Sequence, residues 1–434
     1  MLTRDDAHVV GRLVRLAAPV ALGRVGIVTM GVVDTVVVGR LAPHELAHQA
    51  IGWAMPGPAL LGGIGLLTGV TVLAARALGE GRPGTAVQVW RSGLVLAVVT
   101  GLLACVPVWL VGERVLLGFG IAADLARPAA AVARVLVLSI PFHLVFVAST
   151  YFLEALQRPA PGAVAMWIAN GLNLLLNLLL VPSWGAIGSA WATVLSRLFL
   201  AAAMVAYVGG SRRLVVHHDG AGAIGLGALL AIGGAAAVAH GVEAGAFSAA
   251  SMIAGRLGTT AAATLQMSMS LLTLVFMMAL GLSTAGAVLV SDAVGRGAAR
   301  DATRAGWWAI GLAALAAAAC GLACVGLGTR IAGAYTTDAA LIASFAAVMG
   351  RTAFLMTPDG GQGVADAVLR ARGDNWFPTA SRALAYVVAM PALAVLLAQT
   401  AGRGVAGVIE AVLAASVLAY GTLLARFATL ASRA

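Results

Sequence analysis

Charged residues are scarce in this sequence: they make up 10% of 434 residues, and lysine is absent. A soluble domain carries about 25% charged residues, so a share this low excludes an ordinary soluble protein. Hydrophobic residues account for 61%, and they form repeated stretches of the length that crosses a membrane, about 20 residues. Strands of alternating polarity, typical of a membrane barrel, are missing. The sequence therefore predicts an integral membrane protein built from helices.

Basic residues outnumber acidic ones by 27 to 17, and all of them are arginine. They lie singly or in pairs at the ends of apolar segments, which is typical of topology signals and not of a nucleic-acid-binding patch. We therefore expect no nucleic-acid partner. The cysteines lie inside apolar segments without a Cys or His cluster, so we expect them to pack and not to bind a metal. They are Cys105, Cys320 and Cys324.

Motifs of several catalytic classes are missing as well. The sequence has no G-x-S-x-G nucleophile elbow, no P-loop G-x-x-x-x-G-K and no haem-type cysteine motif. We therefore predict that the protein is not an enzyme and needs no cofactor. Because no ATPase domain is present, transport against a gradient would have to draw on an ion gradient, and buried acids are what such coupling needs.

The sequence repeats itself at an offset of 216 residues, which is almost half its length. Gly39-Arg40-Leu41 returns as Gly255-Arg256-Leu257, and nine of the 22 positions in 65–86 are identical in 281–302. A repeat of this length in a membrane protein favours two similar helix bundles with a path between them.

The apolar stretches predict an all-α integral membrane fold with twelve transmembrane helices in two six-helix bundles. We place the bundles at residues 1–210 and 223–434, joined by a hydrophilic cytoplasmic linker at 211–222. Six spans per half make both halves start on the same side, so the pseudo-two-fold axis runs along the membrane normal. The predicted spans are 16–38, 51–77, 88–111, 129–155, 162–182, 185–208, 231–255, 262–290, 304–327, 341–370, 377–399 and 404–428.

The arginines give the orientation. Seventeen lie at the termini and in the even-numbered connections, among them Arg382, whereas seven lie in the odd-numbered connections. The positive-inside rule then places both termini in the cytoplasm.

Polar residues inside the first bundle are candidates for function. An ionisable group at mid-bilayer costs about 2.5–3.5 kcal/mol on insertion scales, so it is a functional candidate by default. Asp34 lies near the outer end of the first predicted helix, where the alternative is an interfacial acid paired with Arg40. Asn170, Asn173 and Asn177 share one face of the fifth helix. They either line the polar interior of the bundle or join helices to one another.

The seventh predicted helix carries His240 and Glu243 on one face, with Glu243 near mid-membrane. They are candidates for a functional pair, and a purely structural His–Glu pair is the alternative. Three further charged residues, Arg24, Arg197 and Glu410, lie inside or near spans, and the sequence suggests no partner for them.

The tenth predicted helix carries a polar stripe of four residues: Asp359, Gln362, Asp366 and Arg370. Asp366 and Arg370 are one turn apart near the inner end, so we expect them to pair with each other as a structural feature. Asp359 is the deepest of the four and is the functional candidate, with Gln362 beside it.

Four motifs follow one another along the chain in a recognisable order. They are Val33-Asp34-Thr35-Val36-Val37-Val38-Gly39-Arg40-Leu41, the pair Asn173 and Asn177, Glu243 followed by Gly258, and Asp359-x-x-Gln362 followed by Leu369-Arg370 and Asp374. In order and spacing they resemble the motifs of the multidrug and toxic compound extrusion (MATE) transporters, most closely the NorM-like branch. The resemblance covers essentially the whole chain.

The resemblance implies an antiporter of the bacterial inner membrane that exports organic cations or amphipathic drugs by alternating access, driven by H⁺ or Na⁺. Asp34 would couple ions in the first half, and Glu243 and Asp359 would respond to cations in the second. Members that hold a cation there tend to carry an aromatic residue one turn before the acid of the tenth helix. Leu355 occupies that position here, which favours H⁺, although Na⁺ near Asp359 and Glu243 stays open. We expect a monomer surrounded by membrane lipid.

Other classes fit the sequence less well. A lipid-linked oligosaccharide or lipid-precursor flippase of the same superfamily would need a basic cleft for phosphates, whereas the central candidates here are mostly acids. The major facilitator group also has six plus six helices, but the motif around Asp34 and the stripe of the tenth helix argue against it. No pore-filter or catalytic motif supports a channel or an intramembrane enzyme.

Overall fold

The computed structural model describes residues 4–119, 121–211, 226–335 and 338–432, and every regular element within these ranges is a helix. The predicted linker, 211–222, lies outside these ranges except for Ser211. The elements of the first half are α1 (Arg4–Leu41), η1 (Pro43–Glu45), α2 (Leu46–Ala54), α3 (Pro56–Gly79), α4 (Pro83–Gly118), α5 (Ala123–Val137), α6 (Ser139–Ala155) and α7 (Ala160–Gly210). Those of the second half are α9 (Leu226–Arg256), α10 (Thr259–Gly295), α11 (Ala299–Tyr335), α12 (Ala339–Ala371), α13 (Trp376–Ala383), η2 (Leu384–Ala389), α14 (Met390–Val395), η3 (Leu396–Thr400) and α15 (Gly404–Ala431).

Eleven helical runs within the described residues are long and apolar enough to cross a membrane. One of them, α7, extends over 51 residues and contains two of the predicted spans, 162–182 and 185–208. Its backbone leaves helical geometry at Gly185, with φ 54° and ψ −134°. The break falls where the sequence predicts a boundary, so α7 consists of two helical parts that each have the length of a span.

The predicted span 377–399 is built from several short helical pieces. Its residues Leu384–Ala389 form a π-helical turn that ends just before Met390-Pro391. Proline has no backbone N–H to donate and disturbs the preceding turn, which is a usual setting for such a bulge. This turn carries Tyr386, a buried residue of the site described below.

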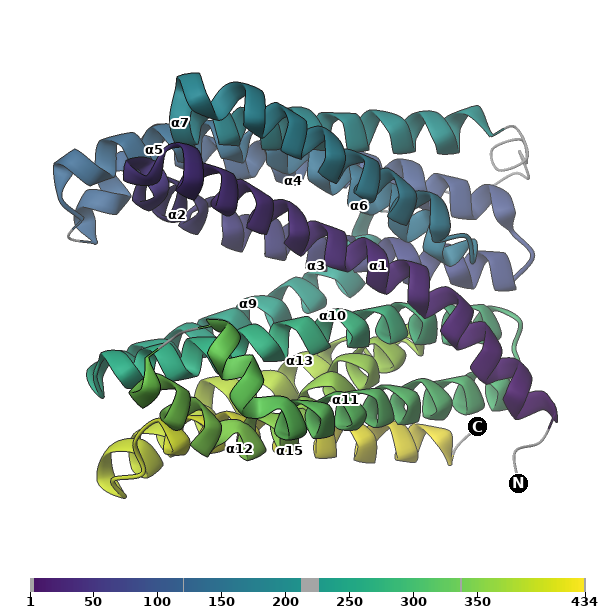
Figure 1. The fold of residues 1–434 in the computed structure, drawn as a ribbon. Coiled ribbons are helices and arrows are strands. Elements are labelled where there is room, and N and C mark those ends of the chain that lie inside the picture. Colours follow the sequence, from purple (N-terminus) through teal and green to yellow (C-terminus); the bar gives the residue numbers. More distant parts are fainter. Residues whose placement is uncertain (1–3, 120, 212–225, 336–337, 433–434) are drawn as a thin grey trace. The chain divides into compact units, whose positions relative to one another are not determined.

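Two compact units make up the chain: one is Leu22–Ala237, and the other combines Met1–Ala21 with Val238–Ala434. In the first unit α6 packs against α3, α4 and α7. In the second, α12 packs against α10, α11 and α15, whose ribbons run beside it in Figure 1.

The first helix of each half belongs to both units. The division falls after Ala21 in α1 and after Ala237 in α9, and these positions are separated by the 216-residue offset of the sequence repeat. Each unit therefore contains the first part of the other half's opening helix. The predicted halves, 1–210 and 223–434, describe the repeat of the sequence, and the compact units differ from them by this exchange.

Close contacts hold these exchanged helix segments in place. In the unit that contains the start of α1, Gly281 of α10 lies against the Ala17 carbonyl, and the Asp6 carboxylate accepts hydrogen bonds from Arg304 (2.7 Å) and Trp308 (2.8 Å). In the other unit, Gly233 of α9 lies so close to the Leu66 backbone of α3 that a Cβ would overlap its carbonyl oxygen. Ala17 and Gly233 are equivalent positions of the repeat, so both units are built on the same kind of close backbone approach.

Candidate functional site

The Asp34 carboxylate lies at the centre of a buried polar cluster in the first unit. It is 1% exposed and accepts hydrogen bonds from Asn173 (3.0 Å), Asn177 (2.7 Å) and Thr193 (2.6 Å). Asn173 and Asn177 are one turn apart on the first part of α7, so both amides face α1, and Thr193 comes from the second part. All three donors are neutral, so hydrogen bonds and not a contacting cation hold this carboxylate.

The alternative interpretation of Asp34 as an interfacial acid paired with Arg40 is wrong. Arg40 is exposed, whereas Asp34 is buried among the amides of α7. The predicted asparagine stripe divides into two roles. Asn173 and Asn177 contact the acid, but Asn170 donates to the Gly26 and Met166 carbonyl oxygens at 3.0 and 2.9 Å. Asn170 therefore joins α7 to α1.

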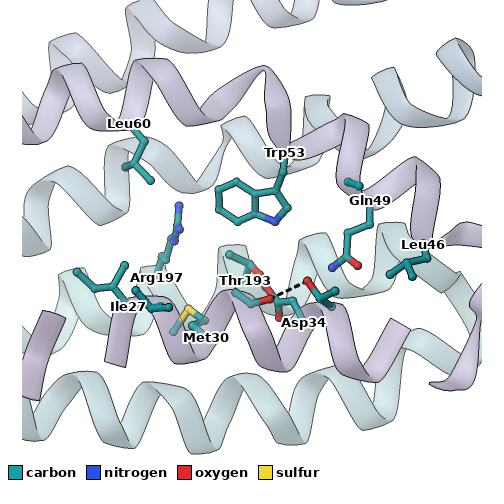
Figure 2. Close-up of a pocket in the computed structure, with 13 residues that line it drawn as sticks. Ile27, Met30, Asp34, Leu46, Gln49, Trp53, Leu60, Thr193 and Arg197 are labelled. Atoms are coloured by element: carbon teal, nitrogen blue, oxygen red, sulfur yellow. Dashed lines mark hydrogen bonds between the residues drawn. The ribbon is translucent and has the colours of Figure 1, made fainter. Parts of the chain in front are cut away.

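A cavity of about 590 Å³ opens beside Asp34. This volume lies within the range of small-molecule sites. Figure 2 shows Asp34 and Thr193 together on one side, with Trp53 and Gln49 extending towards them from α2. Apolar side chains complete the wall: Ile27, Val28, Met30, Leu46 and Leu60. The cavity thus combines one acid, one arginine, one indole ring and a few neutral polar groups within a mostly apolar lining.

Arg197 and Arg24, for which the sequence suggests no partner, each contact a polar side chain in this unit. Arg197 also lines the cavity, where its Nη1 donates to the Ser139 hydroxyl at 2.9 Å and its guanidinium lies 5.3 Å from the centre of the Trp53 ring. Arg24 forms an ion pair with Glu154 at 3.5 Å. Both members of that pair are buried.

Asp359 is the first residue of a buried hydrogen-bond chain in the second unit. Gln362, one turn along α12, donates from its amide to the Asp359 carboxylate (3.1 Å) and to the Tyr386 hydroxyl (2.6 Å). The Tyr386 hydroxyl in turn lies 2.9 Å from the Ser416 hydroxyl of α15. Asp359 and Gln362 therefore lie together as the spacing predicts, and Tyr386 and Ser416 extend the cluster across two more elements.

Glu243 pairs with Arg382 and not with His240. Its carboxylate lies 3.1 Å from Nη1 of Arg382, a residue that is 1% exposed. His240 is close enough to experience the charges of both Glu243 and Arg382. The interpretation of His240 and Glu243 as a structural pair is therefore wrong, because an arginine 139 residues further along the chain takes the histidine's place.

The pairing of Asp366 with Arg370 is confirmed. Arg370 Nε donates to the Asp366 carboxylate at 2.9 Å. Its other nitrogens donate to the Asn375 carbonyl oxygen (2.7 Å) and the Thr379 hydroxyl (3.0 Å), which fixes α12 to the start of α13. This pair closes the inner end of the polar stripe.

The candidate residues thus form two separate clusters, each within one compact unit. Sequence reasoning missed Arg382 because it was counted among the arginines of the connections, and it missed Glu154 because no spacing relates it to Arg24. Tyr386 and Ser416 lie in apolar stretches without a motif. The remaining predicted charge, Glu410, pairs with Arg351 and Arg403, each at 2.7 Å.

The segment His44-Glu45-Leu46-Ala47-His48 has the H-E-x-x-H pattern of zinc hydrolases. Its glutamate is used otherwise: the Glu45 carboxylate accepts a hydrogen bond from the Ala186 N–H (2.6 Å) and so caps the second part of α7. His44 lies in η1, before α2 begins, and the part of the chain that the structure describes contains no group of three side chains suited to a metal. The motif therefore holds helices together.

The comparisons with known proteins agree with this architecture. Residues 19–179 and 235–395 each match the model of the MatE family, and the two matches begin 216 residues apart, as the repeat does. A protein of Caulobacter vibrioides named "Probable multidrug resistance protein NorM" is 36% identical over 428 residues, which cover 96% of this chain and 90% of that one. The "Multidrug resistance protein PmpM" of Pseudomonas aeruginosa is 29% identical and covers 84% and 78%.

Solved structures share the fold. The crystal structure of the eukaryotic MATE transporter AtDTX14 superimposes with a TM-score of 0.88, covering 99% of this chain and 98% of that one at 16% identity. Since the family model matches both halves and a relative with 36% identity spans nearly the whole chain, this protein belongs to the MatE family of multidrug and toxic compound extrusion transporters.

Proposed function

We propose that the protein is an antiporter of the bacterial inner membrane that exports organic cations and amphipathic drugs in exchange for protons. The observation that carries the proposal is the Asp34 site, a buried carboxylate held by three neutral donors at the wall of a cavity with an indole ring. The names of the two relatives, both multidrug resistance proteins, support the export of drugs. The site can exist in two states, one with an ionised Asp34 paired with a cation and one with a protonated, neutral Asp34.

A buried carboxylate is stable when a cation or a proton compensates its charge. An organic cation in the cavity can pair with Asp34 while its apolar part contacts the side chains of Ile27, Met30 and Leu60. A proton on Asp34 removes that attraction. Since the same oxygens serve either the drug or the proton, uptake of one favours release of the other, which is the requirement for exchange.

The driving force depends on how many protons move. Exchange of one proton for one monovalent cation moves no net charge, so only the pH gradient contributes, at about 1.4 kcal/mol per pH unit. A second proton adds the membrane potential, about 2.3 kcal/mol per charge for 100 mV. Asp34 in one unit and the Asp359–Glu243 cluster in the other supply enough acids for two protons. We propose alternating access, with both termini in the cytoplasm.

The flippase alternative is less well supported. A lipid phosphate would need cationic donors, and Arg197, the arginine that lines the Asp34 cavity, already donates to Ser139 and lies over the Trp53 ring. The acid at the same cavity would repel a phosphate.

Reconstituted vesicles test the proposal. Wild-type protein should release protons from preloaded acidic vesicles when ethidium is added, and replacing Na⁺ with K⁺ should not change the rate. Asp34→Asn, Glu243→Gln and Asp359→Asn should each reduce this ethidium-dependent proton flux, whereas Asp292→Asn, an acid outside both clusters that pairs with Arg296, should not. If all three cluster variants still accumulate ethidium against its gradient, the acids are not the coupling groups.

A further inference from the structure

Arg382 is an unusual arginine, since it is among the largest side chains that the second unit buries completely. It lies in the last turn of α13, close to Pro378 and the polar connection before it. An arginine at such a place ordinarily reaches for the membrane surface. Here the guanidinium turns into the protein and approaches Glu243 of α9 at 3.1 Å.

The guanidinium is held there by charge more than by hydrogen bonds. Within the residues that the structure describes, Nε and Nη1 of Arg382 are buried without a hydrogen-bond partner of good geometry. Besides Glu243, the acids Asp366 and Asp359 also contribute to its electrostatic environment. A buried arginine with spare donors beside the Glu243 carboxylate is the counter-ion of that acid.

The buried charges around Arg382 can be assigned one by one. Asp366 is matched by Arg370, all of whose nitrogens have partners nearby. That leaves the carboxylates of Glu243 and Asp359 facing one guanidinium, with His240 and the Tyr386 hydroxyl at the edge of the group. With both acids ionised and His240 neutral, the two carboxylates and one guanidinium carry a net charge of −1, so one more positive charge is needed for neutrality. One proton supplies it.

We infer that Arg382 is a tethered cation that occupies the place of a free monovalent cation beside Glu243 and thereby makes this cluster selective for protons over Na⁺. The inference rests on the proposed antiport and identifies the residue that determines which coupling ion the cluster binds. A proton binds directly to a carboxylate oxygen and needs no shell of ligands. A sodium ion needs several oxygens at once and cannot share Glu243 with a guanidinium, because the two cations repel each other in a poorly screened interior.

Removing the guanidinium would leave oxygens suited to a metal ion. Glu243 and Asp359 would then carry two uncompensated charges. The Gln362 carbonyl oxygen, Oε1, is fully buried and has no hydrogen-bond partner among the described residues. Two carboxylates and a free amide oxygen are the hard ligands that alkali and alkaline-earth cations prefer.

Binding of ²²Na⁺ to the purified, full-length protein tests this inference without any transport step. Arg382→Gln should bind one Na⁺ that unlabelled Na⁺ displaces. Wild-type protein should show no saturable Na⁺ binding, even at 10-fold the Na⁺ concentration that half-saturates Arg382→Gln. The double variant Arg382→Gln/Glu243→Gln should lose this binding again. Arg426→Gln, which breaks an ion pair with Asp374 (2.7 Å) at the edge of the same unit, should behave like wild type.

Several results would overturn the inference. Saturable Na⁺ binding by wild-type protein at any concentration would do so, and that result does not depend on whether Arg382→Gln folds. A folded Arg382→Gln, judged by a monodisperse gel-filtration peak, that binds no Na⁺ would do so as well. Arg382→Lys keeps the tethered charge, so Na⁺ binding by this variant would also contradict it.

The outcome is separable from that of the proposed function. If wild-type vesicles exchange no ethidium for protons but Arg382→Gln gains Na⁺ binding, the antiport proposal fails and the role of Arg382 stands. If exchange occurs and is independent of Na⁺ while Arg382→Gln gains no binding, the antiport stands and another feature excludes Na⁺.

Discussion

The side-chain amide of Asn177 donates a 2.7 Å hydrogen bond to the Asp34 carboxylate, joining two helices whose residues are 143 positions apart. A hydrogen bond to a charged group contributes about 1.5–3 kcal/mol, and this one stabilises the ionised acid that an organic cation would meet.

We therefore expect Asn177→Leu to weaken binding of tetraphenylphosphonium by roughly tenfold or more, the equivalent of about 1.4 kcal/mol. Equilibrium dialysis at pH 8 with radiolabelled ligand measures it. Asn170→Leu is the matched control, because Asn170 bonds to the Gly26 carbonyl and not to the acid. It should lower thermal stability and leave the affinity near that of wild type. Equal losses of affinity in the two variants would contradict the division of roles.

The ion pair between Arg24 and Glu154 is buried on both sides. Removing one member of a buried pair leaves an uncompensated charge and costs about 3–5 kcal/mol. Glu154→Gln should therefore lower the melting temperature in detergent clearly, and the double variant Arg24→Met/Glu154→Leu should recover most of the loss. Glu410→Gln serves as the comparison, since its arginine partners are about half-exposed and exposed pairs contribute about 0–1 kcal/mol. A double variant no more stable than Glu154→Gln would show that the charge is not the cause.

Gly233 marks the closest approach between α9 and α3. A Cβ there would overlap the Leu66 carbonyl oxygen, so Gly233→Ala must push two backbones apart. Such overpacking costs about 1–3 kcal/mol. The adjacent Gly234 has no atom within 4 Å of its would-be Cβ. Gly234→Ala should therefore melt at the wild-type temperature or above it, whereas Gly233→Ala should melt at a lower temperature. Thermal unfolding followed by fluorescence measures both. The opposite order would refute the close contact.

Gly185 combines φ 54° with ψ −134°, a conformation that residues with a Cβ avoid, and the Glu45 carboxylate fills the space where a Cβ would lie. We expect Gly185→Ala to reduce the yield of folded protein and to lower the melting temperature. Glu45→Gln should have a smaller effect, since an amide oxygen can still accept from the Ala186 N–H. Gly171→Ala, in open surroundings on the same helix, is the control.

The sequence was sufficient for features that repeat or that lie within one helix. Hydrophobic length located the spans, the 216-residue offset indicated two related halves, and helical spacing brought Asp359 to Gln362 and Asp366 to Arg370. It also placed Asn173 and Asn177 on one face. What periodicity cannot supply is the partner on a distant helix. The pairs Arg24–Glu154 and Arg382–Glu243 arise only when the helices pack, and no local rule distinguishes an arginine that turns inward from one that marks a membrane edge.

The same limit explains the misassigned neighbours. Helical spacing correctly put His240 on the face of Glu243, but sharing a face does not decide which group contacts a carboxylate. A guanidinium reaching from α13 displaced the imidazole. Similarly, Arg40 is near Asp34 in sequence, yet the amides of α7 are nearer in space, because Asp34 points into the unit and Arg40 lies at its exposed surface.

The exchange of helix starts between the two units bears on the origin of the chain. A single half, produced alone, would lack the segment that fills its own unit, since the first part of α1 belongs with Val238–Ala434 and the first part of α9 with Leu22–Ala237. Two copies of an ancestral half could satisfy this need by swapping their opening helices in a homodimer, and gene duplication with fusion would preserve the swap. Neither half of the 216-residue repeat is therefore a complete unit, because each compact unit takes its first helical segment from the other half.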